Sequence, residues 1–141
     1  MQIWRYLFAA TADLFVLGMV AQILLAGFGI SGLGGQGMQT HIDLGYTLSL
    51  VPIVPLVLSW PARAGRQTIV MCAVLLVLTF VQTILPLARD DMPWISALHP
   101  LNAFIVLGLG IAVARRAIAL ARVEEARTTP ADESVAVTPQ P

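Results

Sequence analysis

The sequence predicts an all-α integral membrane protein, an up-down-up-down four-helix bundle, and three observations support this. Hydrophobic residues make up 57% of the 141 residues and charged residues only 11%, whereas a typical soluble domain carries about 25% charged residues. Four apolar runs are each long enough to cross the roughly 30 Å apolar core of a bilayer as a helix. The connections between them are short, so consecutive helices should run antiparallel.

The four predicted spans follow one another with little sequence between them. They cover residues 4–30, 41–60, 68–87 and 97–116. The connections are a glycine-rich loop at 31–40, a basic turn at 61–67 and an acidic turn at 88–96. Pro52 and Pro55 interrupt the second span, where each removes a backbone hydrogen bond and can bend the helix.

Arginine placement predicts the orientation in the cell membrane. Of the eight basic residues, only Arg89 lies on the side of the second span's start. Because cytoplasmic loops carry the excess of positive charge, we expect both termini of this multi-pass protein in the cytoplasm. Helix should continue past the fourth span, so residues 1–127 form one transmembrane domain. The tail, 128–141, is rich in proline and poor in apolar residues, and we expect it to be disordered.

Composition also limits partners and chemistry. The lipid bilayer is the predicted surrounding, and a net charge of zero without blocks of like charge gives no indication of nucleic-acid binding. Cys72 is the only cysteine, so neither an internal disulfide nor a paired-cysteine metal site is predicted. No Ser/His/Asp set or Cys/His pair is arranged for nucleophilic catalysis, which favours a protein that is not an enzyme.

The chain has two histidines, and each opens a span on the same side of the membrane. His41 begins the second span and His99 the fourth, and these helices are diagonal neighbours in an up-down bundle. Two imidazoles at one depth on opposite walls can be the axial ligands of a haem iron, so we expect a b-type haem between them. Thr40-x-x-Asp43 has the pattern of a capping box, which would start the second helix at His41.

Neighbouring residues fit this hypothesis but allow a simpler one. Gly45 and Ala103 lie four residues after the two histidines, on the same helix face, and would leave room for a flat ring. Asn102 lies on the same face as His99 and could support it by a hydrogen bond. Alternatively, the histidines are solvated structural contacts, and the small residues only let helices pack closely.

Gln22 and Gln82 lie at about the depth of the histidines, in the first and third spans. An amide in hydrocarbon is costly without a partner, so both should turn inward, toward each other, a histidine or a ligand. Plain interhelical hydrogen bonds are the alternative. Each glutamine precedes a histidine by a similar spacing, so the two hairpins are interpreted as possible copies of one unit.

Asp13 is the one acid inside a span. We expect a buried ion pair with Arg63, Arg66 or Arg115, or a protonated acid, and a proton pathway is the weaker alternative.

Several of these features together resemble a known pattern. They are Arg5-Tyr6, Gln22 with Gly27, His41-x-x-x-Gly45, Ala97-Leu98-His99-Pro100-Leu101-Asn102-Ala103 and Arg115-Arg116. Across roughly residues 4–116 the chain resembles an uncharacterised family of small four-span prokaryotic membrane proteins. It is similar, more distantly, to one four-helix half of haem A synthase, in which histidines of the second and fourth helices ligate haem.

The resemblance implies that His41 and His99 are the axial pair, for electron transfer or for haem handling with a redox partner. The chain lacks the second half, the outer cysteine pair and the loop glutamate of that enzyme, so methyl oxidation is not implied. The alternative function is a non-catalytic membrane scaffold or accessory subunit, with Gly18, Gly108 and Gly110 admitting a helix of another membrane protein.

Overall fold

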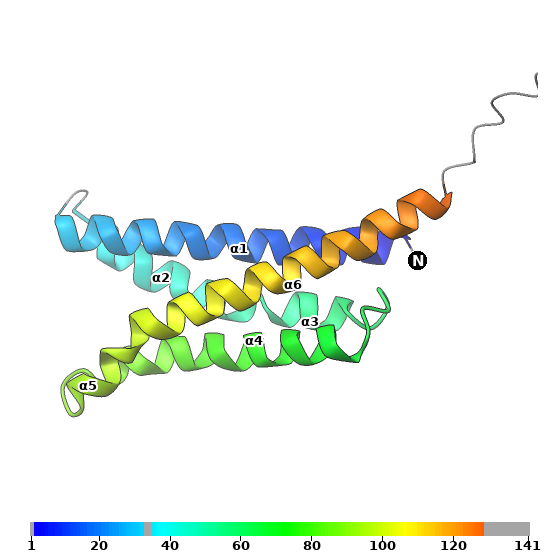
Figure 1. Ribbon diagram of the computed structural model, residues 1–141. Helices are drawn as coiled ribbons and strands as arrows, with labels where there is room; N and C mark the ends of the chain where they lie inside the picture. Colours follow the sequence, from blue (N-terminus) through cyan, green and yellow to red (C-terminus); the bar gives the residue numbers. More distant parts are fainter. Residues whose placement is uncertain (1, 33–34, 129–141) are drawn as a thin grey trace, which may run out of the picture.

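The computed structural model is an all-α four-helix bundle (Figure 1). It describes residues 2–32 and 35–128, with side chains as far as Val123. The helices are α1 (Gln2–Ser31), α2 (Gly37–Leu50), α3 (Ile53–Leu58), α4 (Arg66–Ile84), the 3-10 turn η1 (Leu85–Ala88), α5 (Pro93–Ser96) and α6 (Leu98–Thr128). Four stretches are long and apolar enough to cross a membrane: Gln2–Ser31, Gly37–Leu58, Arg66–Ala88 and Pro93–Val123. The protein is therefore a small integral membrane protein.

The helices pack as a ring of neighbours. α1 packs against α2 and α6, and α4 packs against α6 and against the α2–α3 segment. Consequently α2 and α6 occupy opposite corners of the bundle, as the up-down topology predicts. The orientation of the termini relative to the cytoplasm stays a prediction.

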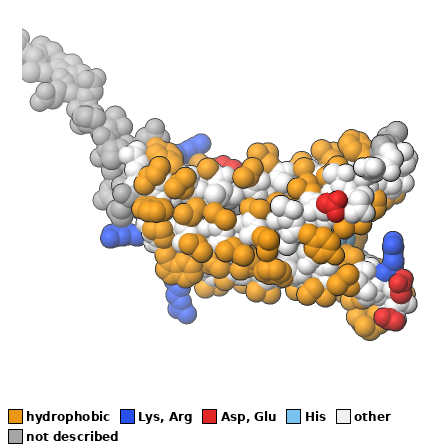
Figure 2. Space-filling view, turned by 180° about the vertical axis from the view of Figure 1, so that it is seen from behind, with side chains coloured by type: hydrophobic (Ala, Val, Ile, Leu, Met, Phe, Trp, Pro, Cys, Tyr) orange, Lys and Arg blue, Asp and Glu red, His pale blue; other side chains and the backbone are white. Residues whose placement is uncertain are grey.

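Apolar side chains fill the centre of the bundle and also cover its outside. Phe8, Phe15, Leu75 and Val113 are buried, whereas large apolar side chains project outward along the helices (Figure 2). Such a surface is suited to lipid.

Asp13 is half-buried and forms no ion pair with any described residue, so the expected pairing with an arginine is absent there.

The end of the bundle near the N-terminus is closed by Arg5. This side chain is buried, and its Nε donates to the Ala62 carbonyl at 3.3 Å and its Nη1 to the Leu120 carbonyl at 3.2 Å. It therefore joins α1 to the turn after α3 and to α6. At the opposite end of the bundle, no side chain of the described residues makes such a connection, and the two helical hairpins separate there (Figure 1).

The predicted start of α2 is wrong. The helix begins at Gly37 rather than His41, and its N-cap residue, Gln36, makes no side-chain cap. The Thr40 hydroxyl donates to the Gln36 carbonyl at 3.1 Å, and Asp43 accepts from Gln39 Nε2 at 2.8 Å, so the capping box does not form. His41 consequently lies in the second turn of the helix.

Two glycines explain the early start. A Cβ on Gly37 would lie 3.0 Å from the Gly29 nitrogen, and a Cβ on Gly29 would lie 2.9 Å from the Met38 nitrogen. Because neither residue carries a Cβ, α2 folds back against α1 directly after the connection. The expected loop at 31–40 is correspondingly shorter.

Other sequence predictions agree with the structure. The second span breaks between α2 and α3 around Pro52, and both Pro52 and Pro55 are buried. α6 continues to Thr128, as predicted. The predicted disordered tail lies outside the described residues from 129 onward.

Two of the glycines expected to admit a partner helix are occupied internally. A Cβ on Gly18 would meet Leu48 at 2.6 Å, and one on Gly110 would meet Phe15 at 3.2 Å. Only Gly108 of that set faces open space.

Candidate functional site

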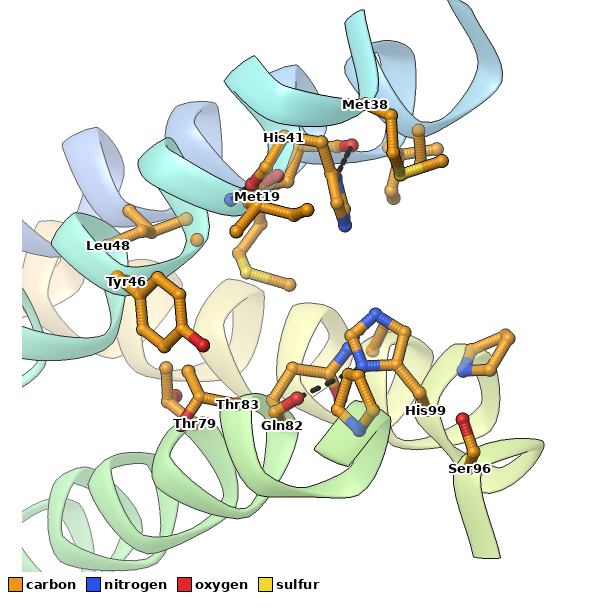
Figure 3. A pocket seen from close by; sticks show the side chains of 18 of the residues that line it. Met19, Met38, His41, Tyr46, Leu48, Thr79, Gln82, Thr83, Ser96 and His99 are labelled. Atoms are coloured by element: carbon orange, nitrogen blue, oxygen red, sulfur yellow. Dashed lines mark hydrogen bonds between the residues drawn. The ribbon is translucent and has the colours of Figure 1, made fainter. Parts of the chain in front are cut away.

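A cavity of about 770 Å³ lies between the two hairpins at the end where they separate. In the view from behind, that end is hollowed between two lobes (Figure 2). The α1–α2 hairpin forms one wall and the α4–α6 hairpin the other. His41 projects into the cavity from the first wall and His99 from the second (Figure 3).

In the first hairpin, His41 and Gln22 are joined by two hydrogen bonds. His41 Nδ1 donates to the Gln22 carbonyl at 3.0 Å, and Gln22 Nε2 donates to the His41 carbonyl at 3.0 Å. Gly45 makes this possible, because a Cβ there would lie 3.0 Å from Gln22 Nε2. The space below His41 therefore accommodates the glutamine side chain.

The other end of the Gln22 amide is unsatisfied. Gln22 Oε1 is buried and has no hydrogen-bond partner among the described residues. The side chain is only 7% exposed and belongs to the cavity lining. A buried acceptor without a donor costs free energy, so this atom is a point at which a ligand or a water molecule would be stabilised.

In the second hairpin, His99 makes the equivalent backbone contact. Its Nδ1 donates to the Gln82 carbonyl at 3.0 Å. In a regular helix, the N–H of residue 86 would donate to the Gln82 carbonyl. Residue 86 is proline and has no N–H, so the carbonyl is available to His99. The helix continues only as the 3-10 turn η1 from Leu85.

Side chains around His99 form a polar chain. Asn102 Nδ2 donates to the Leu78 carbonyl at 3.0 Å and to Gln82 Oε1 at 2.7 Å. Because a carbonyl only accepts, these contacts fix the orientation of both amides. Gln82 Nε2 then donates to His99 Nε2 at 3.2 Å. Asn102 thus supports His99 through Gln82 rather than by touching the ring.

The same tautomer follows for both histidines. Each Nδ1 faces a backbone carbonyl and must carry the proton, which leaves the lone pair of each neutral ring on Nε2. The ring centroids are 6.2 Å apart, with an interplanar angle of 78°. A histidine whose Nδ1–H is held by a carbonyl is the usual arrangement of a metal-ligating imidazole.

The rest of the lining is mainly apolar. Ala103 lines the cavity, whereas Asn102 stands behind it. Sequence reasoning missed Met19, Met38, Tyr46 and Arg89, which also line it. Of these four, only Arg89 could have been predicted from the sequence, because it is the one arginine on the histidine side of the predicted spans.

The donor set limits which metal group would fit. Among the described residues, no three His, Cys, Asp or Glu side chains lie close enough to hold a metal ion together. Two imidazoles alone make an incomplete set for a bare ion. They would suffice for a metal group that brings its remaining ligands with it.

Comparisons with protein-family models, curated proteins and solved structures find no match for this chain. The resemblance to one half of haem A synthase therefore remains an expectation from the sequence, and the case for function rests on geometry.

Proposed function

We propose that the protein binds a b-type haem between His41 and His99, for electron transfer or for haem handling. The observation that carries the proposal is the paired arrangement of the rings. Both Nδ1–H groups are held by glutamine carbonyls, and both rings project into one cavity. A bound haem supplies a one-electron redox centre, and the chain supplies its ligands and surroundings.

The spacing of the rings supports this ligation. A metal–imidazole bond is about 2 Å long, so two imidazoles on one metal have centroids roughly 6 Å apart. The observed separation is 6.2 Å. This agreement in centroid separation supports the proposal that one metal is shared by the two rings.

The surroundings also fit a flat, mostly apolar group. The cavity volume of about 770 Å³ is in the range of sites for sizeable ligands. Ile23, Leu48 and Ala103 supply apolar lining, and the exposed Arg89 is available for a carboxylate. His41 and His99 would hold the metal, and Gln22 and Gln82 would hold the imidazoles in orientation.

An absorption spectrum tests the proposal. The protein is expressed with haem supply and purified in mild detergent with an affinity tag free of histidine, because the chain has only two histidines. We expect a Soret band in the wild-type protein and its loss in the double variant His41→Ala/His99→Ala.

Matched controls replace the other soft ligands in the lining. Thioether sulfur also ligates haem iron, so Met19→Leu and Met38→Leu are made in parallel and should keep the wild-type spectrum. A wild-type protein without a Soret band, or a band unchanged in the double histidine variant, would refute haem ligation by this pair.

A further inference from the structure

The two histidines differ in what touches Nε2, the nitrogen that would bind a metal. His41 Nε2 has no hydrogen-bond partner among the described residues. His99 Nε2 accepts from Gln82 Nε2 at 3.2 Å. One ring therefore presents a free lone pair to the cavity, and the other presents a lone pair already engaged by an amide.

The difference follows from the residues one turn along each helix. After His99 comes Asn102, which is 8% exposed and holds Gln82 Oε1 at 2.7 Å, so the Gln82 amide is turned toward the ring. The corresponding position after His41 is Leu44, which has no donor. There Gly45 lets the Gln22 amide turn to the backbone carbonyl of His41 instead, at 3.0 Å.

We propose that Gln82, held by Asn102, restrains His99, so that His41 binds a metal first and His99 binds only after the Gln82 amide moves away. This inference rests on the proposed haem site and adds an order of ligation to it. Gln82 and Asn102 are positioning residues here. Ligation by His99 exchanges one hydrogen bond for one metal bond, whereas ligation by His41 breaks none.

Spectra of haem-loaded variants test the inference. Gln82→Leu removes the donor to His99 without introducing a thioether, which could itself ligate haem iron. Gln39→Leu makes the same change at an exposed glutamine of α2 that does not line the cavity. We expect wild-type protein to contain a high-spin, five-coordinate fraction. Gln82→Leu should convert that fraction to low-spin, six-coordinate haem and tighten haemin binding roughly two- to tenfold. Gln39→Leu should leave the spin state unchanged.

A second variant and a second measurement protect the test against misfolding. Asn102→Leu leaves Gln82 in place but unheld, and it should shift the spin state in the same direction. His99→Ala should retain five-coordinate haem on His41, and His41→Ala should retain less. In haem-free wild-type protein, imidazole nitrogen NMR should find the Nε2 atoms of both rings unprotonated and only that of His99 hydrogen-bonded.

Failure of the proposed haem site and failure of the proposed restraint on His99 would give different spectra. If no variant shows a Soret band, the proposed function and this inference both fail. If haem binds but Gln82→Leu and Asn102→Leu keep the wild-type spin state, or Gln39→Leu changes it equally, the restraint on His99 is refuted while haem binding stands.

Discussion

Gly29→Ala tests how the first hairpin holds His41 in place. A Cβ at residue 29 would lie 2.9 Å from the Met38 nitrogen and 3.0 Å from its Cα. These are backbone atoms, so the contact is not relieved by rotating a side chain. α1 and α2 would have to separate, and overpacking of this kind costs about 1–3 kcal/mol.

The matched control is two residues away. Gly27 lies in the same helix, and a Cβ there would meet nothing within 4 Å. Both variants gain the same helix propensity, about 1 kcal/mol for Gly to Ala. The propensity gain cancels in the comparison, so Gly29→Ala should be less stable than Gly27→Ala by about 1–3 kcal/mol.

The assay is equilibrium unfolding by SDS in mixed micelles, followed by tryptophan fluorescence. Haem retention is measured on the same samples, because a displaced α2 would carry His41 away from the Gln22 carbonyl. Equal unfolding free energies for the two variants would refute the reasoning, since the close backbone contact would then have no energetic consequence.

Two further substitutions probe polar contacts by the same titration. In Gly45→Ala the new Cβ would lie 3.0 Å from the Gln22 amide nitrogen and should displace it from the His41 carbonyl. The variant should be less stable by about 0.5–1.5 kcal/mol than Gly108→Ala, whose Cβ faces open space. Equal unfolding free energies for these two variants would count against the hydrogen bond. Arg5→Met should cost about 1.5–3 kcal/mol, because the buried guanidinium donates to the Ala62 and Leu120 carbonyls. The same change at the exposed Arg66 should alter stability by less than about 0.5 kcal/mol. Equal effects would contradict a closing role for Arg5.

Much of the architecture was predictable because it depends on composition along the chain. Runs of apolar residues specify membrane-crossing helices whatever their neighbours are. Short connections then specify the antiparallel order, which places α2 and α6 on opposite corners. The start of α2 was not predictable in this way, because it depends on the contact between Gly29 and Gly37 in space.

The candidate site was predictable only to the level of residues. Topology brings His41 and His99 to one end, and the cost of a buried amide turns Gln22 and Gln82 inward. Which atom meets which partner depends on small local features: the missing N–H of Pro86 frees one carbonyl, and Gly45 admits one amide. Their roles toward a ligand stay predictions.

The paired glutamine–histidine contacts support the interpretation of the two hairpins as copies of one unit. In each hairpin, the Nδ1–H of the histidine donates to the carbonyl of a glutamine on the preceding long helix, at 3.0 Å in both cases. The two hairpins therefore share an equivalent hydrogen bond as well as a few identical residues. The two hydrogen bonds lie on opposite walls of the cavity, as expected for two repeats related by an axis along the membrane normal.

In the proposed haem site, the differences between the two hairpins would give the two histidines different roles. The hairpins differ at two positions: the second has Asn102 and Ala103 where the first has Leu44 and Gly45. These differences direct the Gln82 amide to the His99 ring and the Gln22 amide to the His41 backbone carbonyl. Two identical walls would bind a ligand with equal strength on both sides. Among the described residues His41 Nε2 has no hydrogen-bond partner, whereas His99 Nε2 is engaged by Gln82. In the proposed site, His99 would therefore exchange with other ligands while His41 holds the bound haem.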